Sequence, residues 1–427
     1  MRKKSRLTAL LVSAALCFSM IAGFAQIALA AGPADADINV RYAAAYYGVA
    51  FGETVTERAF ADALGLTMGD GEEDGPFGYA RAAVMTVVAA GMEELALTYS
   101  AEKAGAVFAA LDIAFDAEAY AASLPYLAAA VDLGLADPAK LFGDEDISAA
   151  DAADMLVAAY GMQGLARAYL GRTSEPDVYG KLAVAFTNFA MPLDEELVAL
   201  GNAAVKAQIV TGYNIRDNRL SANFEPELSI RYGHSDLAHA LQLAGLLRSE
   251  GIDALIAIEP KVSAFEYLLD WGPVPDPYPT FYVNEEGEDF YIAYALEYDL
   301  VLEFANAADR NRFDGIILAY AKKNSGEEDK ARIVGSWWQP FYSSTITWDE
   351  SYAKVSDNVV GHGDYALHTT SLDEALEAVQ AWFAEAVAEE GQSWFAKAMA
   401  DGGGFTVASF DQYVNLAFHR YLNGESE

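Results

Sequence analysis

The only cysteine of the chain, Cys17, lies in an apolar stretch at the N-terminus, and this limits how the rest of the chain can be held together. The stretch runs from Leu7 to Ala25 behind four basic residues, and Ala28-Leu29-Ala30 follows it. Basic, apolar and small-residue segments in this order are typical of a secretory signal that a signal peptidase removes. A mature chain without this segment has no thiol, so it forms no disulfide and no cysteine-ligated metal site.

The same apolar stretch is almost long enough to span a bilayer, so an uncleaved membrane anchor is the alternative. Acidic residues directly after the Ala-x-Ala site, among them Asp35 and Asp37, favour cleavage. We therefore predict a signal peptide over residues 1–30 and an extracytoplasmic protein, either secreted or held at the cell wall or cell surface. We expect no stable membrane insertion after signal cleavage.

The chain is strongly acidic, with 63 Asp and Glu residues against 27 Lys and Arg residues and a formal net charge of −36. Such a surface repels nucleic acid and anionic lipid, so we expect no nucleic-acid partner. Solubility alone explains the charge, and diffuse binding of divalent cations is the alternative. Hydrophobic residues make up 53% of the chain, which is enough for a packed core.

Residues 31–212 are rich in Ala, Leu and Asp, and their apolar residues recur at a spacing of three and four. This spacing predicts helices, and Ser100, Ser148 and Asp194 stand where N-caps belong. The expected helices are Phe77–Met92, Ala101–Ile113, Ala117–Leu133, Ala149–Tyr160, Tyr179–Ala190 and Asp194–Gln208.

A helical repeat underlies this half. Its clearest copy has a helix from Tyr126 that stops at Gly134, a loop with an aromatic residue, and a second helix capped by Ser148. Weaker copies span Phe51–Leu64 and Ala203–Arg231.

Over residues 40–230 these repeats resemble the S-layer homology modules of secreted Gram-positive proteins, small helical units usually found in threes. In that family an Arg in an Ile-Thr-Arg-Ala-Glu-like motif, at the start of the second helix, grips a negatively charged wall polysaccharide. The matching places here read Val55-Thr56-Glu57, Ile147-Ser148-Ala149 and Ser229-Ile230-Arg231. The resemblance implies a wall-polymer contact at Arg231, with a cell-wall polysaccharide or a surface-layer protein as the partner.

Residues 213–427 mix β-branched and aromatic runs with helical stretches. Leu228–Tyr232 and Ala254–Glu259 read as strands on either side of a helix, Asp236–Ser249, which predicts a βαβ unit with parallel strands. We also expect a helix at Ser263–Leu269, separate strands at Phe290–Tyr294 and Asp299–Phe304, a long helix at Leu372–Glu390 and a terminal helix at Phe410–Leu422. The fold class is thus multidomain, with an N-terminal all-α part of S-layer-homology-like helical repeats at 31–212 followed by an α+β domain at 213–427.

This second half also resembles the C-terminal part of secreted proteins that accompany S-layer homology modules in spore-forming Gram-positive bacteria. The residues that carry the likeness include Tyr232-Gly233-His234, Glu259-Pro260-Lys261 and Gly335-Ser336-Trp337-Trp338. The resemblance implies a location and a partnership, and no reaction.

Four residues are candidates for ligand binding at one edge of the expected parallel sheet. His234 and Ser235 lie between the first strand and the helix, and Glu259 and Lys261 end the next strand. A small anionic group could lie on the helix N-terminus beside His234 and Lys261. Alternatively, His234 bonds a neighbouring loop and Lys261 pairs with Glu259 in solvent.

Trp337 and Trp338 are further candidates. Successive side chains of a strand face opposite ways, so one of the two could form an exposed platform for sugar rings or a partner protein. A sheet covered on both faces is the alternative.

Neither a metal site nor a cofactor is expected. His234 and His239 are five residues apart, which is the wrong spacing for a metal pair on a helix. The acidic loop at 70–75 lacks the alternating ligands of a calcium loop, and the HExxH, GxSxG and Walker motifs are missing.

These features predict a non-catalytic envelope protein that associates with the cell wall or surface layer through its helical units. Its C-terminal domain would bind a glycan, a peptide or a protein partner. The first alternative is an enzyme that acts on cell-wall polymers, with its site near His234 and Glu259. The second is a purely structural role in a surface layer.

Overall fold

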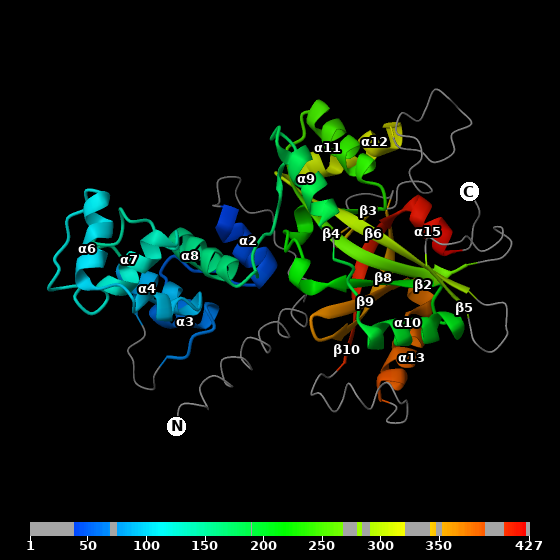
Figure 1. Cartoon of the computed structure of the whole chain (residues 1–427), viewed down its shortest axis with the longest axis horizontal. Helices are drawn as coiled ribbons and strands as arrows, with labels where there is room; N and C mark the ends of the chain where they lie inside the picture. Colours follow the sequence, from blue (N-terminus) through cyan, green and yellow to red (C-terminus); the bar gives the residue numbers. More distant parts are fainter. Residues whose placement is uncertain are drawn as a thin grey trace. The chain divides into compact units, whose positions relative to one another are not determined.

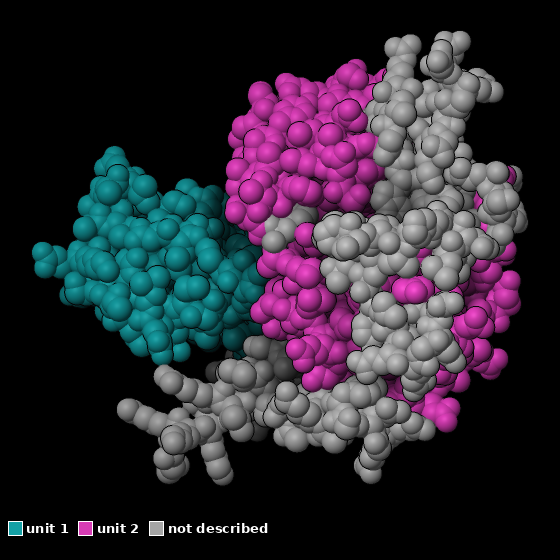
Figure 2. Space-filling view, turned by 45° about the vertical axis from the view of Figure 1, so that its right-hand side comes forward, with its two compact units in different colours: residues 1–167 teal, residues 168–427 magenta. Residues whose placement is uncertain are grey.

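The chain divides into two compact units, residues 1–167 and residues 168–427, which are coloured separately in Figure 2. The division falls ahead of the expected boundary at 212, because the segment after residue 167 packs within the second unit. The expected signal peptide at 1–30 lies outside the described residues. Within the described part of the chain, no helix has the length and apolar character needed to cross a membrane. The computed structural model describes residues 38–68, 75–188, 190–267, 280–283, 291–320, 342–346, 352–388 and 405–423.

Helices make up the regular structure of the first unit (Figure 1). The hydroxyl groups of Thr56, Ser100 and Ser148 each accept a backbone N–H at a helix start, so these side chains define where helices begin. Alanines at the helix contacts are fully buried, and their small side chains allow close packing around Phe60 and Phe108. The helices are α2 (Ile38–Tyr47), α3 (Glu57–Ala63), α4 (Tyr79–Ala89), α5 (Glu93–Ala96), α6 (Ala101–Ala110), α7 (Leu124–Asp132) and α8 (Ala149–Met162).

The second unit is built on a closed antiparallel barrel of eight strands. The strands follow one another in the order β4, β2, β9, β8, β10, β7, β3 and β6, and β6 then pairs with β4 to close the ring. Two short strands, β1 and β5, add to the outside of β4 and β6. The strands are β1 (Gly171–Arg172), β2 (Gly212–Asp217), β3 (Ser229–His234), β4 (Ala254–Glu266), β5 (Thr280–Val283), β6 (Tyr291–Phe304), β7 (Tyr342–Ser344), β8 (Tyr352–His362), β9 (Tyr365–Ser371) and β10 (Thr406–Asn415).

This barrel shows that the predicted fold class, an all-α part followed by an α+β domain with a parallel βαβ unit, is wrong. Strands β3 and β4 do flank a helix, α11 (Leu237–Ser249), but β6 lies between them and is antiparallel to both. A strand–helix–strand pattern does not show which strand becomes the neighbour. The long strand β6 pairs with β3 on one edge and with β4 on the other, so it separates these two strands within the described barrel.

Several predicted elements are also replaced by longer strands. The two strands expected at 290–294 and 299–304 are the single strand β6, and the expected helix at 263–269 begins inside β4. The expected terminal helix is strand β10 followed by the short helix α15 (Leu416–Leu422). In each case pairing with neighbouring strands overrides local preference.

Two groups of helices cover the outer face of the barrel (Figure 1). Helices α9 (Val178–Thr187), α11 and α12 (Ala307–Tyr320) pack on outward side chains of β3, β4 and β6. Helices α10 (Glu195–Lys206) and α13 (Leu376–Ala388) pack on outward side chains of β2, β8 and β9. Because side chains alternate along a strand, the residues between these apolar positions face the interior of the ring.

A tight contact between α10 and β2 provides a test of this packing. A Cβ atom on Gly201 would lie 2.6 Å from the ring of Tyr213, so we expect Gly201→Ala to lower the free energy of unfolding by about 1–3 kcal/mol. The matched control is Gly180→Ala on the exposed side of α9, where a Cβ atom meets nothing within 4 Å. The control should raise the same free energy by up to about 1 kcal/mol through helix propensity. Urea unfolding measures both, and equal effects would contradict this packing.

Candidate functional site

Charged side chains line the interior of the barrel. Cross-strand partners share a face of a sheet, and the register pairs Arg216 with Lys261, Lys261 with Glu297, and Glu259 with Asp299. This is the face opposite the apolar side chains that pack under the helices. We name the following residues the interior charge cluster: Arg216, Arg231, Glu259, Lys261, Asp299, Asp357 and His368.

Asp299 is the centre of the interior charge cluster. Its carboxylate lies 2.6 Å from Nζ of Lys261, 3.0 Å from Nη2 of Arg216 and 4.0 Å from Nη1 of Arg231. Burial alone would raise the pKa of Asp299, but these three cations outweigh burial and hold the pKa well below its ordinary value. Asp299 is therefore an anion at neutral pH.

Gly233 makes room for this arrangement. A Cβ atom at this position of β3 would lie 3.1 Å from Nζ of Lys261 and 3.3 Å from Oδ1 of Asp299. A residue without a side chain therefore lets the ion pair lie close against the strand.

Arg231 offers a part of its guanidinium group that the cluster does not use. Its Nη1 atom donates to Oε2 of Glu259, whereas no described residue forms a hydrogen bond with its Nε or Nη2 atom. Its side chain is 32% exposed, although it points into the ring. The N–H groups of this open edge can bind a carboxylate or phosphate in a bidentate manner.

Glu259, in contrast, is fully engaged. Its Oε1 atom accepts the backbone N–H of Ala222 at 2.7 Å, and its Oε2 atom accepts from Arg231. Ala222 belongs to a loop whose Phe224 packs on inward side chains of β4 and β6. This loop covers inward side chains of β4 and β6 and fixes the Glu259 carboxylate in place.

Asp357 and His368 complete the cluster from the strands β8 and β9. Oδ2 of Asp357 lies 2.9 Å from Nδ1 of His368, and their side chains are 18% and 16% exposed. Burial would raise the pKa of Asp357, but His368, Arg216 and Arg231 lower it. The coupling to both arginines places this pair in the same electrostatic environment as Asp299.

The structure brings together Arg231, Glu259 and Lys261 of the sequence-based candidates, but not His234 or Ser235. His234 is three residues from Arg231 on β3, so it faces the outer side of the sheet, away from Glu259. Its Nδ1 atom accepts the backbone N–H groups of Ser235 and Asp236, both at 2.9 Å. The N-cap of α11 is Asp236 rather than Ser235. Trp337 and Trp338 lie outside the described residues.

Sequence reasoning missed Arg216, Asp299, Asp357 and His368. A signal for Asp299 exists in β6, where Glu297, Asp299 and Glu303 alternate with apolar residues. Such alternation is ordinarily read as a strand with one solvent-exposed face. Only closure of the ring turns that face into an interior.

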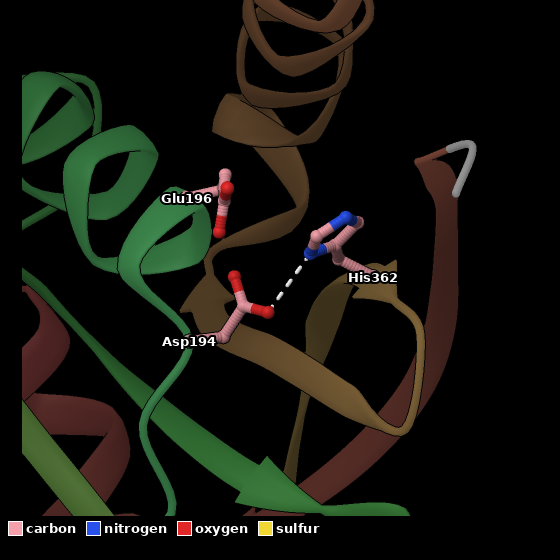
Figure 3. Close-up of side chains that lie close together, drawn as sticks. All are labelled: Asp194, Glu196 and His362. Atoms are coloured by element: carbon pink, nitrogen blue, oxygen red, sulfur yellow. Dashed lines mark hydrogen bonds and ion pairs between the residues drawn. The ribbon is translucent and has the colours of Figure 1, made fainter. Parts of the chain in front are cut away.

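A second cluster, on the outer side of the barrel, has side chains that could hold a metal ion (Figure 3). Asp194 precedes α10, Glu196 lies in its first turn, and His362 ends β8. One ligand atom from each lies within 4.8 Å of the others, and Nδ1 of His362 is 2.8 Å from Oδ2 of Asp194.

Comparison with known proteins adds no relative: no family model, no curated protein and no solved structure matches the chain.

The central position of Asp299 gives a stability prediction. Asp299→Asn removes the buried anion shared by three cations of the barrel interior, so we expect the free energy of unfolding to fall by about 3–5 kcal/mol. The control is Asp253→Asn, which breaks a surface pair with Arg172 and should cost at most about 1 kcal/mol. Urea titrations at neutral pH compare the two, and an equally small loss for Asp299→Asn would show that the cluster does not depend on this residue.

His234 gives a pH prediction. Burial and the neighbouring His239, whose ring is stacked at 4.0 Å, lower the pKa of His234 to about 4, while Asp236 opposes them. The pKa of His234 in the folded protein lies below its value near 6.5 in the unfolded chain. The contribution of the neutral His234 ring to the free energy of unfolding is therefore complete above pH 6.5 and is lost as the pH falls toward 4. The free energy of unfolding should fall by about 3 kcal/mol through His234. Burial also lowers the pKa of His239, so this residue adds a loss in the same direction.

Urea unfolding between pH 7 and pH 4.5 measures this dependence. The variant His234→Asn carries no titrating ring, so its unfolding free energy should vary less over that range than that of the unchanged chain. Identical slopes for both proteins would refute the assignment to His234.

Proposed function

We propose that the chain is an exported, non-catalytic protein of the bacterial cell envelope whose barrel binds an anionic group of a wall glycan. The observation that carries the proposal is the open guanidinium edge of Arg231 inside the interior charge cluster. The acidic composition and the N-terminal signal pattern support an extracytoplasmic location. The resemblance of the helical repeats to S-layer homology modules supports the cell wall or surface layer as the place of action. The third expected copy, Ala203–Arg231, is not a pair of helices, because it forms the end of α10 and the strands β2 and β3, with Arg231 in β3.

The charges and free hydrogen-bond donors of the interior charge cluster indicate which class of ligand it would bind. Arg216, Lys261 and Arg231 share the anions Asp299, Glu259 and Asp357, so the positive charges are largely compensated. What remains for a ligand is the directional pair of N–H donors on Arg231. A carboxylate on a sugar ring fits this donor pair, and neighbouring polar groups such as Ser343, paired with Arg231 across β3 and β7, suit hydroxyl groups.

An enzyme acting on wall polymers is the second candidate, and one observation favours it. Glu297 and Asp299 lie on the same face of β6, and their pKa values move in opposite directions. Burial raises the pKa of Glu297, whereas the surrounding cations lower that of Asp299. A carboxyl group with a raised pKa beside an ionised carboxylate is an arrangement that glycosidases use. Release of reducing sugars from wall fragments is the measurement that would reveal it.

The proposed binding function is tested with glucuronate and with neutral glucose as the comparison sugar. We expect residues 31–427 to bind glucuronate more tightly than glucose, and Arg231→Lys to weaken glucuronate binding at least tenfold, because Lys keeps the charge but loses the paired donors. The matched control Arg172→Lys alters a surface arginine of the same unit and should leave binding unchanged. Isothermal titration calorimetry gives the affinities.

Two results would count against the proposal. One is equal affinity for glucuronate and glucose, and the other is an equal response to the two arginine variants. Sedimentation with wall sacculi that retain or lack their secondary polysaccharide tests the wall association separately.

A further inference from the structure

The cluster of Asp194, Glu196 and His362 lies apart from the interior charge cluster. Gly361 pairs with Ala366, whose other partner is Arg216, so Gly361 faces inward. The next residue, His362, therefore faces outward, on the side that α10 covers. Two segments far apart in the sequence meet here, which is visible in Figure 3.

The side chains of Asp194 and His362 are held in place by contacts on their far sides. Oδ1 of Asp194 caps α10 by accepting the backbone N–H of Leu197 at 2.9 Å, which leaves Oδ2 directed at His362. The ring of His362 is stacked on Phe405 at 4.6 Å. The side chains of Asp194 and His362 are only 12% and 15% exposed, so a ligand would meet a largely prearranged site.

Within this cluster, Glu196 is the residue whose position the described contacts do not explain. It is partly buried, and its carboxylate points toward Asp194 and His362 (Figure 3), yet no described residue gives it a hydrogen bond or an ion pair. Two carboxylates directed at one point repel each other. A cation between them removes this repulsion, and a neutral imidazole nitrogen supplies a third ligand atom.

We propose that Asp194, Glu196 and His362 bind one divalent transition-metal ion of the zinc type. Two carboxylate oxygens and one imidazole nitrogen are a ligand set that such ions accept, and a fourth position would be filled by water. For Nδ1 of His362 to act as the ligand, the neutral ring carries its proton on Nε2, and the hydrogen bond to Asp194 gives way to metal ligation. The ion would tie the start of α10 to the end of β8.

The proposal is tested with zinc and a chromophoric chelator that competes for it, on residues 31–427 freed of metal. We expect one zinc ion per chain and a rise of the melting temperature on binding. Glu196→Gln should weaken the affinity at least tenfold, and it leaves the helix cap and the Asp194–His362 contact in place. His362→Gln should weaken it by a similar factor.

The matched control is Glu195→Gln. Glu195 stands in the same turn of α10 and is exposed, and its loss removes the same charge without touching the three ligands. It should leave the affinity unchanged. Equal weakening by Glu195→Gln and Glu196→Gln would mean diffuse attraction to an acidic surface and would overturn the proposal, as would an unaltered affinity in His362→Gln.

Cobalt as a spectroscopic probe gives an independent readout. Bound cobalt should show visible absorption bands that change in His362→Gln, because the nitrogen ligand is lost. Bands that are identical in both proteins would exclude His362 as a ligand. Far-ultraviolet circular dichroism of each variant verifies that it is folded, so that a lost site is distinguished from a lost fold.

Discussion

The pairing of β4 with β6 is the contact on which the second unit depends. The two strands are hydrogen-bonded along all of β4, and without this pairing the sheet would be open, with β4 and β6 near its two ends. Closure gives the backbone groups of these edges their partners. It also turns one face of every strand toward a common interior, and the interior charge cluster exists for that reason.

The distribution of side chains across this sheet is the reverse of a barrel with an apolar interior. The apolar residues beneath the five helices face outward, and the interior charge cluster faces inward beside a small apolar group that includes Leu255, Ala257 and Val301. Removing charges from water is unfavourable unless each has a partner, and Asp299 supplies one for three cations at once. Hydrophobic burial beneath the helices therefore stabilises the barrel, while the interior holds charged groups in ion pairs with one another.

The two proposed sites use opposite faces of the same sheet. Arg231 presents hydrogen-bond donors to the interior, whereas His362 and the start of α10 present acceptors on the outer side. One site suits an anion and the other a cation, so each can be removed by a single substitution without altering the chemistry of the other.

The sequence by itself determined some local features of this protein, the helix caps above all. Ser148 and Asp194 cap helices where their position before an apolar periodic segment predicts it, because an N-cap needs only a nearby oxygen and the next backbone N–H groups. The alternation of Glu297, Asp299 and Glu303 with apolar residues is equally readable as a strand. The tertiary structure alone decided that β6 separates β3 from β4, that Glu259 faces Asp299 while His234 faces away, and that Asp194 meets His362. These outcomes depend on which distant strands pair, and pairing is set by ring closure and packing over the whole unit, which no local pattern encodes.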